Sequence, residues 1–164
     1  VIARCPWATT GRTHHRTPNI ITSLELDPAE MEKRNIHLQK KYAEIEENEV
    51  RFEELHCEDA EYLIVAFGSC ARIAQKAMEM AREEGIKVGL LRPIALWPFP
   101  SKAIAARAAQ VKGILTVELN AGQMVEDVRL AVECKVPVEH FGRLGGIVPD
   151  PDEVITALKE KLIK

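Results

Sequence analysis

The stretch Tyr62-Leu63-Ile64-Val65-Ala66-Phe67-Gly68-Ser69 decides the fold. Its unbroken apolar run is typical of a strand buried on both faces, as in parallel sheets covered by helices. Gly68 and Ser69 then open an amphipathic helix that runs to Glu84 and ends at Gly85. We expect a tight turn at this junction, with Ser69 as the N-cap, because the glycine spacing matches no phosphate-binding fingerprint.

Strands and helices go on alternating from this stretch towards the C-terminus. Apolar runs predict further strands at residues 87–91, 114–119 and 136–141, and a weakly alternating edge strand at 50–55. Apolar periodicity predicts helices at residues 101–110, at 123–133 and after a capping box at Asp150 and Glu153. Such alternation requires crossover connections, which give a mostly parallel sheet with helices on both faces.

Residues 1–49 form a separate region in the sequence. An irregular arm rich in Pro, Thr and His is followed by a long, highly charged helix, for which Asp27 is the predicted N-cap and Glu30 completes a capping box. Its thin apolar stripe consists of Met31, Leu38, Tyr42 and Ile45. We therefore predict a connecting arm with a charged helix at residues 1–49 and an α/β domain at residues 50–164.

Composition excludes several classes of protein. The formal net charge is −3, with 22 basic residues interleaved among 25 acidic ones, which argues against a nucleic-acid-binding protein. The four cysteines form no CxxC pair, so we predict reduced thiols, with Cys70 and Cys134 packed as small apolar residues. No segment approaches the roughly 18 apolar residues of a membrane span, and no signal peptide is recognisable, so we expect a cytoplasmic protein. The chain begins at Val1 and is interpreted as part of a longer protein.

The segment from Arg92 to Pro100 follows a predicted strand and is the first candidate interface. It lies at the carboxyl end of that strand, where open α/β sheets place their functional loops. Three prolines restrict its backbone and present Trp97 and Phe99, residue types that often anchor interfaces. The alternative is a loop that folds over its own core.

Polar residues follow the next buried strand and complete the candidate interface. Glu118, Asn120 and Gln123 are predicted at the same carboxyl edge, where they could orient a partner or instead satisfy one another and the start of the next helix. Residues 142–146, rich in glycine, match no phosphate-binding spacing and predict a flexible surface turn. His14-His15-Arg16 is interpreted as a contact-positioning segment rather than a metal site.

Four segments carry a family resemblance. They are residues 59–68, residues 87–93, Leu96-Trp97-Pro98-Phe99-Pro100, and Val117-Glu118-Leu119-Asn120 with Gly122-Gln123-Met124. Together they resemble the alpha subunit of 2-oxoacid:ferredoxin oxidoreductases. The arm from Thr10 to Leu24 and the charged helix after it are similar to the branched-chain, or 2-oxoisovalerate, members.

The resemblance implies a three-layer α/β/α fold of the transketolase C-terminal type. Its five-stranded sheet would contain one antiparallel strand, at residues 50–55. The resemblance also implies that this chain holds no catalytic, cofactor-binding or metal-binding residue. Thiamine diphosphate with Mg²⁺ would lie between a missing N-terminal pyrimidine-binding domain and a separate beta subunit, and iron–sulfur clusters would lie on other subunits or domains, including a ferredoxin-like subunit.

The activity implied for the whole enzyme converts a 2-oxoacid, coenzyme A and oxidised ferredoxin to acyl-CoA, CO₂ and reduced ferredoxin. This chain would then bind the other subunits and form part of the wall of the thiamine diphosphate site. Two alternatives stay open at this point: a stand-alone interaction or regulatory domain of the same fold, and the beta subunit of a branched-chain 2-oxoacid dehydrogenase.

Overall fold

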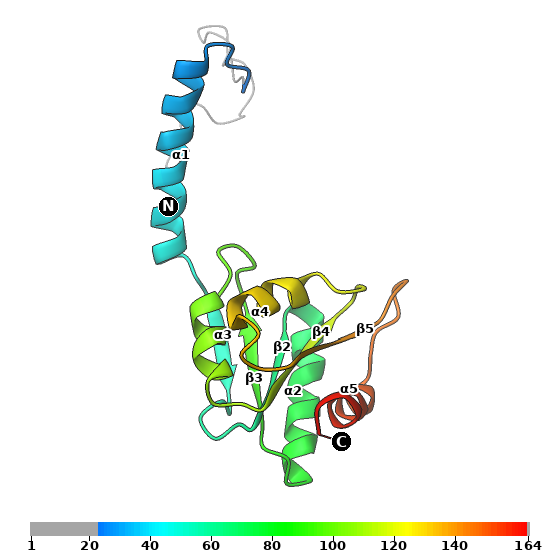
Figure 1. Cartoon of the computed structure of the whole chain (residues 1–164). Helices are drawn as coiled ribbons and strands as arrows, with labels where there is room; N and C mark the ends of the chain where they lie inside the picture. The colour runs from blue at the N-terminus through cyan, green and yellow to red at the C-terminus, as the bar shows by residue number, and fades with distance from the viewer. Residues whose placement is uncertain (1–22, 164) are drawn as a thin grey trace, which may run out of the picture. The chain divides into compact units, whose positions relative to one another are not determined.

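The computed structural model describes residues 23–163 (Figure 1). The chain divides into two units between Lys41 and Tyr42. Helix α1, Pro28–Asn48, begins where the sequence predicts, because the Asp27 carboxylate accepts hydrogen bonds from the backbone N–H groups of Ala29 at 2.8 Å and Glu30 at 3.2 Å. The capping role of Asp27 is therefore confirmed. The Glu30 carboxylate itself pairs with Lys33 at 2.6 Å.

The second unit contains a five-stranded sheet. The strands are β1 Phe52–Leu55, β2 Tyr62–Ala66, β3 Val88–Pro93, β4 Gly113–Glu118 and β5 Val138–Gly142, in the order β1-β3-β2-β4-β5. Strand β1 runs antiparallel to β3, and the other pairs are parallel. The mostly parallel sheet and its single antiparallel strand are therefore confirmed.

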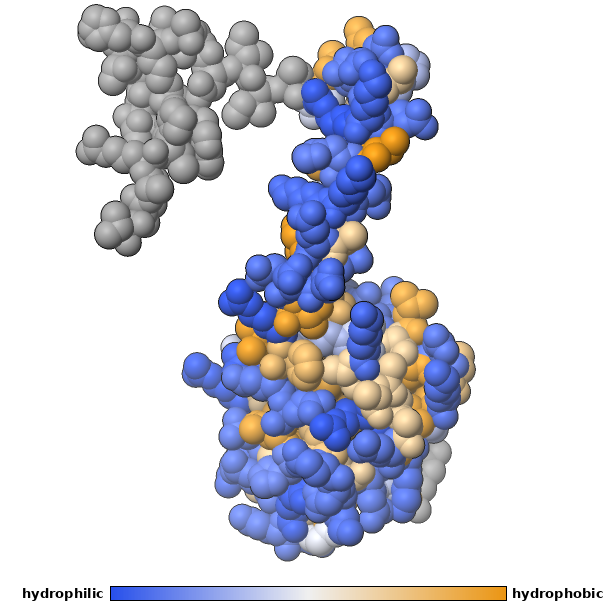
Figure 2. All heavy atoms as spheres, turned by 90° about the vertical axis from the view of Figure 1, so that its left-hand side faces the viewer, coloured by the Kyte–Doolittle hydropathy of each residue, from blue (hydrophilic) through white to orange (hydrophobic). Residues whose placement is uncertain are grey.

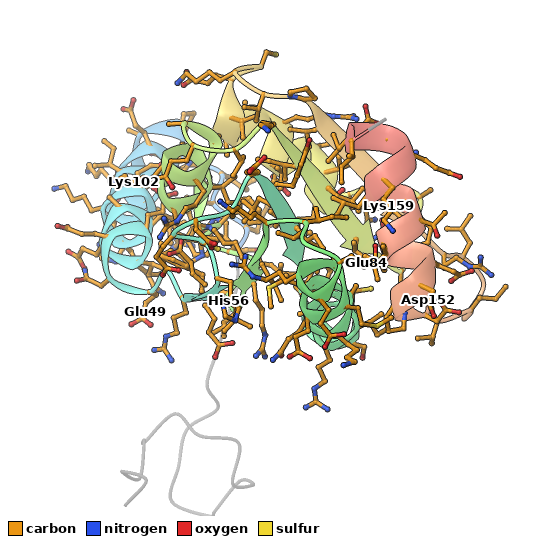
Figure 3. The ribbon with its side chains drawn as sticks, turned by 90° about the horizontal axis from the view of Figure 1, so that it is seen from below. Glu49, His56, Glu84, Lys102, Asp152 and Lys159 are labelled. Atoms are coloured by element: carbon orange, nitrogen blue, oxygen red, sulfur yellow. The ribbon has the colours of Figure 1, made fainter. Side chains whose placement is uncertain are left out.

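Helices cover both faces of the sheet, as Figures 1 and 3 show. They are α2 Gly68–Glu83, α3 Ser101–Ala108, α4 Met124–Val132 and α5 Pro151–Leu158, which continues as a π-helical turn at Lys159–Ile163. Helices α2 and α5 pack on one core, and α3 and α4 on the other. At the surface, Lys159 pairs with Glu84 at the end of α2 (Figure 3). The three-layer prediction is confirmed.

Two local predictions are wrong. Ser69 is not the N-cap of α2, because the Ala71 N–H already bonds to the carbonyl of Phe67, which places Ser69 inside the first turn. Cys134 is exposed rather than packed, because α4 ends at Val132 and Cys134 has a left-handed backbone with φ of 61°. Buried packing of Cys70 is confirmed.

The two edge strands are fixed by arginine side chains. Arg107 of α3 makes a two-point ion pair with Glu54 of β1, with N···O distances of 2.9 and 2.6 Å. Arg129 of α4 donates to the carbonyl of Val138 in β5 at 3.1 Å. Within residues 23–163, no helix is long and apolar enough to cross a membrane.

Candidate functional site

The loops after β3, β4 and β5 lie at the carboxyl edge of the sheet, and we use "carboxyl edge" for residues 94–100, 119–123 and 143–149. Seven large apolar side chains of these loops are exposed: Ile94, Leu96, Trp97, Leu119, Leu144, Ile147 and Val148. Exposed apolar side chains that gather on one side of a domain indicate an interaction surface.

The loop after β3 is built on prolines packed into the domain. Pro98 and Pro100 are buried, and Phe99 packs against the core beneath α3 and α4. Trp97 is 55% exposed, and its ring forms a T-shaped pair with the Tyr42 ring at a centroid distance of 5.7 Å. Phe99 thus follows the alternative in which the loop packs on its own core, whereas Trp97 is presented to the outside.

An open groove of about 890 Å³ borders the Trp97 loop. Its walls include Val50, Phe52, Trp97, Phe99 and Lys102. Apolar side chains gather on this side of the domain, as Figure 2 shows. The groove is open, and its walls are largely apolar.

Arg92 has a local structural role. It lies in β3 opposite Glu53 of β1, and its guanidinium donates to the Glu53 carboxylate at 2.9 Å. This cross-strand pair ties the antiparallel edge strand to the sheet. An interface role for Arg92 stays a prediction.

Glu118, the last residue of β4, adjoins the carboxyl edge and is unusual because it is a carboxylate residue that is only 1% exposed. Its two oxygens accept backbone hydrogen bonds from Gln123 at 3.2 Å, Met124 at 2.8 Å and Val125 at 3.0 Å. These N–H groups form the start of α4, whose N-cap residue Gln123 makes no side-chain cap. Glu118 therefore caps α4 from the end of β4, and the negative charge is favourable at a helix N-terminus.

Asn120 and Gln123 complete a short closed loop. The Asn120 side-chain oxygen accepts from the Gly122 N–H at 2.8 Å, and its amide group donates to the Gln123 side-chain oxygen at 3.4 Å. The structure thus brings these two residues and Glu118 together. They form hydrogen bonds with one another and with the backbone N–H groups at the start of α4, as in the second of the two predicted alternatives. Their role towards a partner stays a prediction.

Three further residues lie close to Glu118 and Asn120 but belong to no motif in the sequence: Thr116, His140 and Gly142. We call these five residues and Gln123 the Glu118 cluster. The His140 imidazole Nδ1 lies 3.4 Å from Glu118 Oε1 and 3.3 Å from the Thr116 hydroxyl. Gly142 leaves room for the Asn120 carbonyl, since a Cβ at Gly142 would lie 2.2 Å from that oxygen. The pairing of β4 with β5 creates these contacts, so they follow from strand order rather than from local sequence.

The cluster does not fit a thiamine diphosphate site. A hollow of about 120 Å³ lies beside Glu118 and is also lined by Phe99 and Gln123. Ligand sites usually measure roughly 300–1,000 Å³, and the Glu118 oxygens already bind the helix start. Among residues 23–163, no group of three His, Cys, Asp or Glu side chains is placed to hold a metal ion. The segment His14-His15-Arg16 lies outside the described residues.

Two buried thiols are protected from ionisation. Burial, with the nearby Glu54 carboxylate, raises the pKa of Cys57 to about 11. Burial also raises the pKa of Cys70. Alkylation requires the thiolate, so both groups should react slowly.

We predict that iodoacetamide at pH 8 modifies Cys134 at least tenfold faster than Cys57 or Cys70, because Cys134 is exposed. Peptide mass spectrometry over a time course measures each site separately. Addition of urea should bring the three rates together. Equal rates in the folded protein would contradict the burial of Cys57 and Cys70.

The fold and the site define an α/β domain of the transketolase type that carries an exposed carboxyl edge. The likeness to a split-gene transketolase has a TM-score of 0.59 and 21% identity, covers 69% of this chain and 41% of that chain, and shows the fold alone. Residues 60–154 match the family model described as pyruvate:ferredoxin oxidoreductase core domain II. The chain belongs to this family.

Similar proteins agree with this family. Ketoisovalerate oxidoreductase subunit VorB of Methanothermobacter marburgensis is 44% identical over 94% of this chain, and that of Methanothermobacter thermautotrophicus is 46% identical over 94%. The chain spans only 43% of the length of these two relatives. The resemblance to the branched-chain members is confirmed.

A solved structure has the same fold. It is the 2-oxoglutarate:ferredoxin oxidoreductase from Magnetococcus marinus with 2-oxoglutarate, coenzyme A and succinyl-CoA bound. The TM-score is 0.72 at 25% identity, over 83% of this chain and 24% of that chain. The predicted fold class is therefore confirmed by comparison as well.

Proposed function

We propose that this chain is the structural and subunit-docking portion of a 2-oxoacid:ferredoxin oxidoreductase that acts on a branched-chain 2-oxoacid. The observation that carries the proposal is the identity of 44–46% to ketoisovalerate oxidoreductase subunits over 94% of this chain. The whole enzyme would convert a 2-oxoacid, coenzyme A and oxidised ferredoxin to acyl-CoA, CO₂ and reduced ferredoxin in the cytoplasm.

The contribution of this chain would be architectural. The Glu118 carboxylate, the Asn120 side chain and the Gln123 side-chain oxygen make hydrogen bonds within the domain. Thiamine diphosphate, Mg²⁺ and iron–sulfur clusters would be held by an N-terminal pyrimidine-binding domain, a beta subunit and a ferredoxin-like subunit. The exposed apolar side chains of the carboxyl edge would meet those neighbours.

We predict that the isolated chain binds no thiamine diphosphate. The family resemblance places this cofactor between an N-terminal pyrimidine-binding domain and a beta subunit, and the hollow at Glu118, of about 120 Å³, is too small to hold it alone. Isothermal calorimetry with thiamine diphosphate and Mg²⁺ should give no binding heat, whereas the enzyme assembled from all its subunits should bind both and oxidise 2-oxoisovalerate. A micromolar affinity of the isolated chain for thiamine diphosphate would contradict the architectural role. An assembled enzyme without activity on 2-oxoacids would contradict the proposed reaction.

We predict that Trp97→Ala weakens assembly and costs less folding stability than the loss of a core tryptophan. Trp97 is 55% exposed, so its partly buried surface and its contact with Tyr42 should together contribute about 2 kcal/mol to folding. An interface tryptophan typically contributes about 2 kcal/mol or more to association, which corresponds to an affinity loss of about 30-fold. Urea unfolding of the variant chain and titration with the other subunits measure the two quantities.

Leu130→Ala is the control for Trp97→Ala, because Leu130 is 78% exposed but lies on α4, away from the carboxyl edge. Leu130→Ala should change neither the free energy of unfolding nor the affinity for the other subunits appreciably. A Trp97→Ala chain that loses about 3–5 kcal/mol of stability and assembles normally once folded would show that the loop serves its own core.

A further inference from the structure

The loop between β5 and α5, which is part of the carboxyl edge, exposes large apolar side chains. Leu144 is 58% exposed, Ile147 52% and Val148 59%, all within five consecutive residues. In Figure 1 this loop is the orange segment that extends beyond the end of the sheet. Such a concentration of exposed apolar surface is costly for a free surface and typical of a contact site.

Both ends of the loop are bound to the domain. At its start, the Arg143 N–H donates to the Glu118 carbonyl at 3.2 Å, and the Arg143 guanidinium pairs with Glu153 at 2.8 Å. At its end, Pro149 is buried and Asp150 forms a complete capping box with Glu153. The loop is at the surface, as predicted, but its base is held in one geometry.

The turn within the loop is made by two glycines. Gly145 and Gly146 have φ values of 65° and 85°, a conformation that residues with a Cβ rarely adopt. A further hydrogen bond joins the Ile147 N–H to the Leu144 carbonyl. A loop held in this way presents its apolar side chains at low entropic cost, which favours binding to a shaped protein surface.

The charges beside the loop indicate the chemistry of its partner. Arg143 and Glu153 neutralise each other. Glu160 and Lys161 also line the hollow beside α5, and their charges cancel. Asp150 and Asp152 have no basic partner within 4 Å among residues 23–163, so the net charge beside the loop is negative. This charge opposes an anionic lipid surface and favours a protein with Lys or Arg around an apolar patch.

We propose that the β5–α5 loop is a docking element for another subunit of the enzyme, which presents an apolar patch edged by Lys or Arg. Leu144, Ile147 and Val148 enter the patch, and Asp152 meets a basic side chain at its rim. This inference rests on the proposed function, because it assumes that the chain assembles with other subunits. It is separate from the Trp97 contact, since a different loop carries it.

The first test is a triple variant, Leu144→Ser with Ile147→Ser and Val148→Ser, in the enzyme co-expressed with all its subunits. The three side chains are exposed, so folding should be retained while affinity for the partner subunit falls by about tenfold or more. Leu130→Ser is the matched control, because Leu130 is exposed on α4. Urea unfolding of each variant chain shows whether the fold is retained, and if the triple variant fails to fold, Leu144→Ser alone replaces it.

The second test is zero-length carbodiimide cross-linking of the assembled enzyme, followed by peptide mass spectrometry. A cross-link from Asp152 to a Lys of another subunit is expected, and Asp152→Asn should abolish it, whereas Glu83→Gln should not. Cross-links only between two copies of this chain, or normal assembly of the folded triple variant, would overturn the proposal. If the wild-type chain assembles with no other subunit, the proposed function fails instead.

Discussion

Glu118→Ala is expected to lower the free energy of unfolding by about 3 kcal/mol or more. The change removes the acceptor of three backbone N–H groups at the start of α4 and leaves them buried or half-buried without a partner. Each unsatisfied buried donor costs roughly 1–3 kcal/mol. The truncation also opens a cavity at a residue that is 1% exposed.

Urea unfolding monitored by circular dichroism measures this loss, and hydrogen exchange locates it at the amides of residues 123–125. Glu126→Ala is the matched control, because Glu126 is exposed in the first turn of the same helix and should cost only about 0.5 kcal/mol. Glu118→Gln keeps the side-chain volume but places an amide N–H₂ group beside the backbone N–H donors. Its loss of unfolding free energy should therefore lie between those of Glu118→Ala and Glu126→Ala. Similar losses for Glu118→Ala and Glu126→Ala would show that the buried carboxylate does not cap α4.

Gly142→Ala should also cost about 3 kcal/mol. The new Cβ would lie 2.2 Å from the Asn120 carbonyl oxygen and 2.6 Å from the His140 ring nitrogen. Overpacking typically costs about 1–3 kcal/mol, and here the closest atom belongs to the backbone, which cannot rotate away. The β4–α4 and β5–α5 loops would have to separate, so thermal unfolding should begin at a lower temperature.

Gly113→Ala provides the comparison, because its Cβ would meet only the end of the Leu162 side chain, at 2.8 Å. That flexible side chain can move, so the loss should be much smaller. Adding His140→Ala to Gly142→Ala should not restore stability, since the clash with the Asn120 carbonyl remains. Restoration would mean that the imidazole, rather than the backbone, sets the requirement for glycine.

The fold could be predicted because each element has a local signal. The apolar run of β2, the capping box at Asp150 and Glu153, and the apolar stripes of α2 and α4 need no knowledge of distant contacts. The wrong position of the α2 N-cap has a local cause as well. Ser69 is a favourable capping residue, but the turn at Gly68 lets the helix begin with the Phe67 carbonyl.

The candidate site could be predicted only in part. Its location at the carboxyl edge follows from the parallel strands, and the motif Glu118-Leu119-Asn120 identified the right segment. The capping role of Glu118 could not be derived from the sequence. The three N–H groups that donate to its carboxylate lie five to seven residues further along the chain. His140 and Gly142 meet this loop through the pairing of β4 with β5, which no spacing in the sequence reveals.

The hydrogen bond from Arg129 to the Val138 carbonyl affects how this protein can aggregate. The carbonyls of Pro137 and Glu139 bond towards β4, so the carbonyl of Val138 points to the open side of β5. An open strand edge is a template for adding a foreign strand, and natural sheets block it with charged side chains. The guanidinium occupies this acceptor, so we expect it to hinder the addition of a foreign strand at this position of β5.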